Sequence, residues 1–189
     1  MTFAENWFSV DQASLISGLA YLVKDRGLVV EIGCWEGKST YHIANAIFPT
    51  TLYAVDTWRG NEDESMEHPS VIAAKERDVF QRFNDNMAEL TQGNVIAIQS
   101  DWRDALALIP GPVGFLHIDA AHDYVSVFAM LVAWYPCMIK GGIICGDDFK
   151  TADASRADLG GGVELAVRTF FTDRTIHSEH NAWWVYVSN

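Results

Sequence analysis

The chain has 189 residues, of which 49% are hydrophobic, and this suits one folded domain with a sizeable core rather than a disordered chain. A formal net charge of −12 argues against nucleic acid as the main partner, because an acidic surface repels a phosphate backbone. Three cysteines without a C-x-x-C pair indicate reduced thiols rather than a disulfide framework or a structural zinc site.

The start of the sequence lacks the basic segment and apolar block of a signal peptide. No apolar run approaches the length of a membrane span. We therefore expect a cytoplasmic protein that has no membrane partner.

Short apolar strands and amphipathic helices alternate along the chain. Ser9 and Gln12 have the spacing of a capping box, which predicts a helix that ends at Gly27. Apolar runs typical of strands buried on both faces lie at 28–33, 51–56, 95–100, 113–119 and 141–147. Apolar residues at helical spacing lie at 41–48, 79–90, 127–135 and 163–171.

The end of the chain has a different pattern. Residues 174–179 and 182–189 look like two strands joined by a short polar turn, so they must pair antiparallel. We therefore predict one domain over residues 1–189, of the α/β class. Its doubly wound sheet is mostly parallel, has helices on both faces and ends in an antiparallel hairpin.

Two polar segments border the edge of this sheet where the strands end. Residues 57–70 and 149–162 suit either a lid over a substrate or solvated surface loops, and the sequence favours neither. The triple glycine at 160–162 is consistent with a hinge or with the flexible start of a helix.

Ligands of open α/β sheets bind beyond the carboxyl ends of the strands, so the residues at those ends are the candidate site. The first strand ends in E-x-G-x-x-x-G-x-S, formed by Glu31, Gly33, Gly37 and Ser39. This is neither the G-x-G-x-x-G of a dinucleotide fold nor a P-loop. The glycines allow close approach of a ligand, and the acid suits a ligand with a cationic part.

The next two strand ends have features of a nucleoside site. Asp56 ends the second strand, where an acid can accept hydrogen bonds from a ribose diol, although a turn aspartate is the alternative. Ser100, Asp101 and Trp102 follow the third strand and could hold an adenine against an aromatic wall. A helix N-cap explains Asp101 equally well.

Acids gather at the last two strand ends. Asp119 ends the fourth strand, and Asp147 and Asp148 end the fifth, so the three carboxylates should meet at one edge if the strands are neighbours. A hard divalent cation, most plausibly Mg²⁺, would relieve their repulsion. His122 would lie beside it as a candidate general base. The alternative is that the acids cap a loop and that the histidine packs at the surface.

Four stretches together resemble a known family: EIGCWEGKST, YAVDTW, HIDAAHDY and KGGIICGDDF. They are similar to class I S-adenosylmethionine-dependent methyltransferases, and more narrowly to the small metal-dependent O-methyltransferases of the macrocin-type and cephalosporin-hydroxylase-like branch. The resemblance covers residues 28–149. It implies a seven-stranded sheet whose seventh strand is antiparallel.

The resemblance also implies roles for individual residues. Glu31, Gly33 and Gly37 would surround the methionyl part of S-adenosylmethionine, and Asp56 would bind the ribose. Ser100, Asp101 and Trp102 would lie near the adenine. Ser39 and Asp119 complete the implied cofactor set. The implied metal ligands are Asp119, Asp147 and Asp148, with His122 as base.

Two departures bear on the substrate. Ala120 stands where the family pattern has glycine, and Ala120 and Ala121 turn the chain and leave room for a ligand. The chain lacks the extra regions of the sugar-modifying members. The acceptor must reach the edge between residues 57–70 and 149–162, where Trp58, Arg59, His68, Lys150 and Arg156 lie in the sequence beside several acids. This mixture suits a polar hydroxyl compound such as a sugar or a catechol-like diol and does not choose between them.

Other classes of protein stay open at this point. A metal-dependent phosphoester hydrolase would use similar ligands, although such sites recruit more histidines. An inactive nucleoside-binding relative would keep the fold, whereas a dehydrogenase lacks support without G-x-G-x-x-G. The adjacent Trp183 and Trp184 face opposite sides of a strand, so one of them could be exposed at a contact within a homo-oligomer. A sheet covered by helices on both faces would explain both tryptophans equally well.

Overall fold

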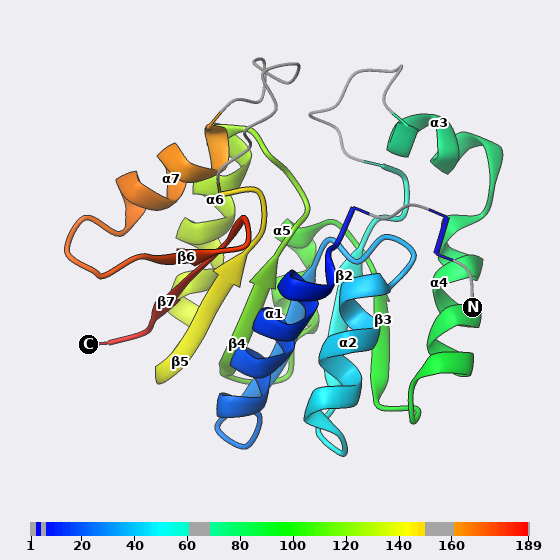
Figure 1. Ribbon diagram of the computed structural model, residues 1–189, viewed down its shortest axis with the longest axis horizontal. Coiled ribbons are helices and arrows are strands. Elements are labelled where there is room, and N and C mark those ends of the chain that lie inside the picture. The colour runs from blue at the N-terminus through cyan, green and yellow to red at the C-terminus, as the bar shows by residue number, and fades with distance from the viewer. Residues whose placement is uncertain (1–2, 5–6, 61–68, 150–160, 189) are drawn as a thin grey trace.

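The computed structural model describes residues 3–4, 7–60, 69–149 and 161–188, and its strands form one seven-stranded sheet (Figure 1). The strands are β1 (Leu28–Ile32), β2 (Leu52–Asp56), β3 (Val95–Gln99), β4 (Val113–Ile118), β5 (Met138–Gly146), β6 (His177–Glu179) and β7 (Ala182–Tyr186). The helices are α1 (Val10–Val23), α2 (Lys38–Ile47), α3 (Pro69–Glu76), α4 (Val79–Leu90), α5 (Trp102–Ala105), α6 (Tyr124–Trp134) and α7 (Gly162–Phe170). Within the described residues, no helix is both long and apolar enough to cross a bilayer.

The strand order places a ligand crevice near the middle of the sheet. The order is β3-β2-β1-β4-β5-β7-β6, and β1 pairs in parallel with both β2 and β4. Successive strands run outward from β1 in one direction through β2 and β3, and in the other through β4 and β5. Ligands of such sheets bind where this direction reverses, beyond the carboxyl ends of β1 and β4.

The last two strands confirm the predicted hairpin. β7 pairs antiparallel with β5 and with β6, while the pairs among β1 to β5 are parallel. His180 and Asn181 form the turn with φ values of 51° and 66°. The mostly parallel, seven-stranded α/β sheet is therefore as expected, whereas a single domain over the whole chain stays a prediction.

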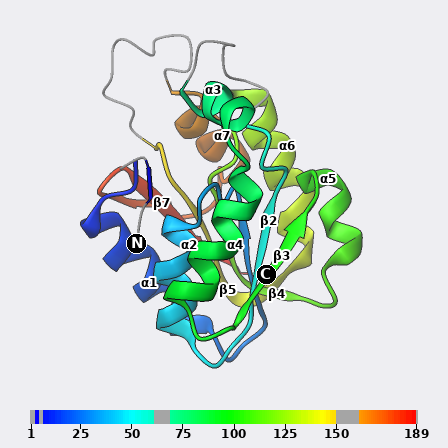
Figure 2. The same ribbon diagram turned by 90° about the vertical axis from the view of Figure 1, so that its right-hand side faces the viewer.

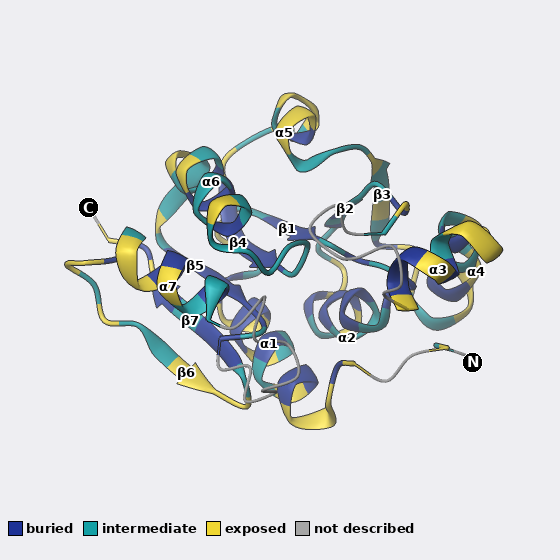
Figure 3. Cartoon of the chain, turned by 90° about the horizontal axis from the view of Figure 1, so that it is seen from above, coloured by how far each residue is buried: buried dark blue, intermediate teal, exposed yellow. Residues whose placement is uncertain are grey.

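Helices cover both faces of the sheet (Figure 3). α1 and α2 pack together over one face, and α6 and α7 pack together over the other. α4 extends the first layer past α2 toward β3 (Figure 2). Trp183 packs with the α6 and α7 layer and Trp184 with the α1 layer, so the covered sheet accounts for both tryptophans.

The predicted capping box begins α1. Ser9 Oγ accepts a hydrogen bond of 3.2 Å from Gln12 N, and Gln12 Oε1 accepts one of 2.7 Å from Ser9 N. These bonds satisfy two amides at the start of the helix. The helix then buries a stripe of apolar residues, Ile16, Leu19, Ala20 and Val23, which fixes it against the sheet and α2.

Two elements differ in detail from the prediction. α3 was not predicted, and it precedes α4, which covers the predicted helical range 79–90. The chain is not helical at Arg77 and Asp78, and Asp78 caps α4 by accepting a hydrogen bond from Gln81 N. β5 begins at Met138 rather than at Gly141. Gly141 lies inside the strand with a φ of 77°, where the pairing of β5 with β4 is irregular. The glycine therefore belongs to a β-bulge and not to the start of the strand.

Candidate functional site

The turn after β1 requires glycine at position 33. Gly33 has a φ of 87°, and a β carbon there would lie 2.1 Å from the carbonyl oxygen of Asp119. Its amide donates to Val55 O at 2.9 Å, and the Asp119 amide donates to Ile32 O at 2.8 Å. The backbone of this turn therefore lies directly against the ends of β2 and β4, where the crevice opens.

The Asp56 carboxylate organises the loops after β1 and β2. Its Oδ2 accepts from the amides of Cys34 at 2.7 Å and Trp35 at 2.8 Å, and its Oδ1 accepts from Trp58 N at 2.6 Å. Burial raises the pKa of Asp56, and the three amide donors oppose this rise. A carboxylate offers about four acceptor positions, so Asp56 keeps capacity for a ligand hydroxyl on Oδ1.

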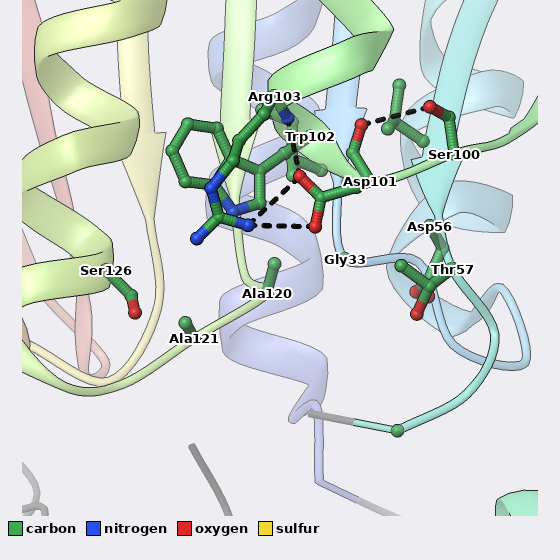
Figure 4. A pocket seen from close by; sticks show the side chains of 13 residues that line it. Gly33, Asp56, Thr57, Ser100, Asp101, Trp102, Arg103, Ala120, Ala121 and Ser126 are labelled. Carbon is green, nitrogen blue, oxygen red and sulfur yellow. Dashed lines mark hydrogen bonds and ion pairs between the residues drawn. The ribbon is translucent and has the colours of Figure 1, made fainter. Parts of the chain in front are cut away.

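A pocket opens beyond the carboxyl ends of β1, β2 and β3 (Figure 4). It brings together five residues that were predicted to bind a cofactor: Gly33, Asp56, Ser100, Asp101 and Trp102. The other lining residues are Ile32, Val55, Thr57, Gly60, Arg103, Ala120, Ala121 and Ser126. The two alanines border the pocket where the sequence predicted room for a ligand.

Arg103 is a pocket residue that sequence reasoning missed. Its guanidinium lies 4.4 Å from the ring centroid of Trp102, and its Nη1 lies 3.1 and 3.0 Å from the two carboxylate oxygens of Asp101 (Figure 4). Asp101 also caps α5 by accepting from Arg103 N at 2.8 Å. Asp101 is thus both an N-cap and a pocket residue. The position of Arg103 in the sequence, directly after Trp102, could have indicated that it belongs to the pocket.

Glu31 lies beneath the glycine turn and not in the pocket. Its side chain is fully buried, with Oε2 accepting from Thr40 Oγ1 at 2.6 Å and Oε1 lying 3.0 Å from His117 Nδ1. None of its surface is exposed, and its predicted place beside the methionyl part of a cofactor stays a prediction. Glu31 instead joins β1 to α2 and β4.

Gly37 and Ser39 are also absent from the pocket lining among the described residues. Gly37 caps α2 with a φ of 90°, and a β carbon there would lie 2.5 Å from Met87 Cε. Ser39 is buried in the first turn of α2. Close packing between α2 and α4 therefore explains the glycine, and the cofactor roles of both residues stay predictions.

Three predicted residues meet at the ends of β4 and β5. One ligand atom from each of Asp119, His122 and Asp148 lies within 4.8 Å of the other two, in a group that could hold a metal ion. His122 Nε2 is 3.0 Å from Asp148 Oδ2. Asp148 has a φ of 55°, and its Oδ1 accepts from Asn181 Nδ2 at 3.1 Å.

Asp147, predicted as the third acidic ligand, lies outside this group. Its two oxygens accept hydrogen bonds of 2.6 and 2.7 Å from the Gln12 amide, and its Oδ1 also accepts from Asp148 N at 2.8 Å. Both acids follow the last residue of β5, and the left-handed backbone of Asp148 directs its side chain away from that of Asp147. The ligand role of Asp147 stays a prediction.

Burial and neighbouring negative charges raise the pKa values of two acids at this edge. Burial, followed by the negative charges of Asp147 and Asp148, raises the pKa of Asp119 well above its usual range. Burial and then the charge of Asp148 raise the pKa of Asp147 to about 6. A positive charge among these carboxylates would remove the repulsion.

Gln12 and Asn181 are further residues that sequence reasoning did not assign to the site. Each donates its side-chain amide to one of the two acids after β5. Gln12 is 135 residues from Asp147 in the chain, and no local pattern connects the two. Only the packing of α1 beside β5 brings them together.

Comparison with known proteins gives a family match over most of the candidate site. Residues 30–149 match the model of a protein family that is described as a methyltransferase domain. This range begins in β1 and ends just after the two acids that follow β5. No curated protein matches the sequence.

Solved structures share the fold. The O-methyltransferase NovP has a TM-score of 0.67 and 18% identity, over 95% of this chain and 79% of NovP. CalS11, a calicheamicin methyltransferase, has a TM-score of 0.68 and 14% identity, over 96% of this chain and 82% of CalS11. TomG, an O-methyltransferase from Streptomyces achromogenes solved in complex with SAM, has a TM-score of 0.67 and 16% identity, over 96% and 81% of the two chains.

Proposed function

This chain belongs to the methyltransferase-domain family, and on that premise we propose that it transfers a methyl group from S-adenosylmethionine to a hydroxyl of a small polar acceptor. The single observation that carries the proposal is the pocket beyond β1, β2 and β3. A glycine turn, an acid at the end of β2 and an aromatic wall after β3 border one space there. These are the features that a bound nucleoside requires.

The pocket residues divide by the part of the donor that suits them. Asp56, which keeps acceptor capacity on Oδ1, suits the ribose diol. Trp102 and Asp101 suit the face and the amino edge of the adenine. Gly33 allows the ligand to approach the backbone without a side chain between them.

Oxygen as the methyl-accepting atom is supported by the relatives. NovP and TomG are named as O-methyltransferases, and CalS11 is described as a TDP-rhamnose 3′-O-methyltransferase. A sugar hydroxyl is therefore the acceptor we favour, with a catechol-like diol as the alternative. The phosphoester hydrolase and the inactive nucleoside binder, which the sequence left open, are not favoured by the family match.

The acidic group suits a divalent cation. Asp119 and Asp148 offer carboxylate oxygens in a group whose ligand atoms, with that of His122 beside them, lie within 4.8 Å of one another. Burial, followed by the negative charges of Asp147 and Asp148, raises the pKa of Asp119. Hard oxygen donors favour Mg²⁺. Asp147 lies outside this group, with both carboxylate oxygens on the Gln12 amide, so its part as a third acidic ligand stays a prediction. When bound, such a cation acts as a Lewis acid that lowers the pKa of the acceptor hydroxyl.

His122 is the residue proposed to remove the acceptor proton. Asp148 Oδ2, 3.0 Å from His122 Nε2, orients the imidazole and stabilises its protonated form. The acceptor oxygen then forms a bond to the methyl carbon while the carbon–sulfur bond breaks. S-adenosylhomocysteine leaves, and the proton stays on His122 until it passes to solvent.

A transfer assay tests this proposal. The protein is incubated with S-adenosylmethionine that carries a labelled methyl group and with a panel of nucleotide sugars and catechols, in Mg²⁺ or in EDTA. We expect the labelled methyl group to appear in one of these acceptors, and we expect this transfer to require Mg²⁺. If EDTA leaves the rate of transfer unchanged, the metal has no part in the reaction. If no hydroxyl compound becomes labelled, the result counts against O-methylation.

A further inference from the structure

We propose that Gln12 is a positioning residue for the acidic site: from α1, it fixes the Asp147 carboxylate and, through it, the conformation of Asp148. This inference rests on the proposed function, because it concerns the residues assigned to the cation. It adds a residue outside the family-matched range of 30–149. The contact between Gln12 and Asp147 is the observation that motivates it.

The contact between Gln12 and Asp147 is short and buried, and it involves both oxygens of the carboxylate. Gln12 Nε2 lies 2.6 Å from Asp147 Oδ1 and 2.7 Å from Asp147 Oδ2. The two residues are 6% and 8% exposed, so little water competes for these hydrogen bonds. A buried hydrogen bond to a charged group is among the stronger polar contacts in proteins.

The other end of the amide determines its orientation. Gln12 Oε1 accepts from the Ser9 amide at 2.7 Å, so the oxygen faces a donor while the nitrogen faces two acceptors. Turning the amide over would set nitrogen against N–H and oxygen against carboxylate. The hydrogen-bond network therefore allows one orientation, with the N–H group toward Asp147.

α1 is a rigid support for this amide. The helix buries Ile16, Leu19 and Val23 and packs against α2, β4 and β5. Gln12 lies in its first turn, where the capping box fixes the backbone. Because both the oxygen and the nitrogen of the Gln12 amide are hydrogen-bonded and the helix is packed, the amide holds the Asp147 carboxylate in one position.

Asp147 transmits this position to Asp148. The Asp148 amide donates to Asp147 Oδ1 at 2.8 Å, and Asp148 has a φ of 55°, which L residues adopt only at a cost. The fixed carboxylate helps to hold that conformation. The Asp148 side chain consequently faces His122, 3.0 Å from its Nε2, rather than following Asp147 to the other side.

A purely structural role would make Gln12 a helix cap and nothing more. Ser9 offers a matched control, because Ser9→Ala removes a capping hydrogen bond from the same helix start without touching Asp147. Gln12→Met removes the amide donor at nearly unchanged length. Gln12→Asn keeps the amide but shortens its reach, and serves as the second variant should Gln12→Met fail to fold.

The test measures Mn²⁺ binding to metal-free protein by electron paramagnetic resonance, in which free and bound ion are distinguished without turnover. We expect the Kd for Mn²⁺ to rise about tenfold or more in Gln12→Met and Gln12→Asn. It should change less than about twofold in Ser9→Ala, since that variant keeps the contact with Asp147. Titration with S-adenosylhomocysteine should give the same affinity in all four proteins.

Two results would overturn the inference, and they are distinguishable. Equal Mn²⁺ affinity in wild type and both Gln12 variants, or equal weakening in Ser9→Ala, would reduce Gln12 to a helix cap while leaving the proposed function intact. No Mn²⁺ binding by the wild-type protein would instead remove the metal from the proposed function, and this inference with it.

Discussion

His122 Nε2 and Asp148 Oδ2 lie 3.0 Å apart, although one residue follows β4 and the other follows β5. The parallel pairing of these two strands brings their carboxyl ends to the same edge. A histidine that is oriented by a carboxylate has the arrangement of a general base. The geometry of this pair is the basis for the first prediction.

Replacing His122 by alanine should slow methyl transfer by roughly two to four orders of magnitude, because the acceptor proton loses its base. Binding of S-adenosylhomocysteine should be nearly unchanged, since His122 does not line the donor pocket. Single-turnover rates and calorimetric titration measure the two effects. His177→Ala, on the edge strand β6, is the control, and a wild-type rate in His122→Ala would exclude it as the base.

Trp102→Ala should weaken donor binding about tenfold, because stacking of a base on an aromatic side chain contributes about 1–3 kcal/mol. Trp102→Phe should retain most of the affinity, since the aromatic face is kept. Titration of each variant with S-adenosylhomocysteine gives the ratio. Equal affinity in the alanine variant and the wild type would place the adenine away from Trp102.

Gly33→Ala should destabilise the fold by about 3 kcal/mol, because it combines a left-handed backbone with a collision between the new β carbon and the Asp119 carbonyl. Gly93→Ala is the control. Gly93 also has a positive φ, of 77°, but its β carbon would meet nothing within 4 Å, so about 1 kcal/mol is expected. Urea denaturation compares the two, and equal losses would contradict the close approach at Gly33.

The stability of the metal-free protein should depend on pH through Asp147. Its pKa rises from an ordinary value of 3.8 to about 6 on folding, chiefly through burial. Between these two values the folded state binds more protons than the unfolded state, so raising the pH across this window lowers the free energy of unfolding. The loss from this group is at most ~3 kcal/mol.

Urea denaturation in EDTA between pH 4 and 7, with Asp147→Asn as the reference, isolates this effect. The stability of the wild type relative to the variant should fall as the pH rises. A relative stability that increases with pH would show that the folded protein prefers the charged Asp147, and that its pKa is not raised.

The strand-end residues were predictable because they depend on local patterns. Apolar runs located the strands, and parallel order then placed Asp56, Asp119 and Asp148 at one edge. The capping box of Ser9 and Gln12 was likewise a local signal. The family resemblance, drawn from four short stretches, agrees with the match over residues 30–149.

Residue roles that depend on packing could not be predicted in the same way. The motif containing Glu31 did not reveal that Thr40 and His117 enclose its carboxylate. Nor did the sequence show that Asp147 turns toward α1, because side-chain direction at a strand end follows from the register and from the neighbouring helix. The contacts of Glu31 with His117 and of Asp147 with Gln12 join segments that are distant in the chain.

Calorimetric titration of the protein with S-adenosylmethionine, in Mg²⁺ and in EDTA, tests most directly whether this pocket binds the methyl donor. We expect binding at one site per chain with a Kd in the range of about 1 μM to 1 mM. Trp102→Ala should weaken this binding about tenfold. Absence of binding at millimolar donor, in a protein shown to be folded, would show that this pocket does not hold the methyl donor.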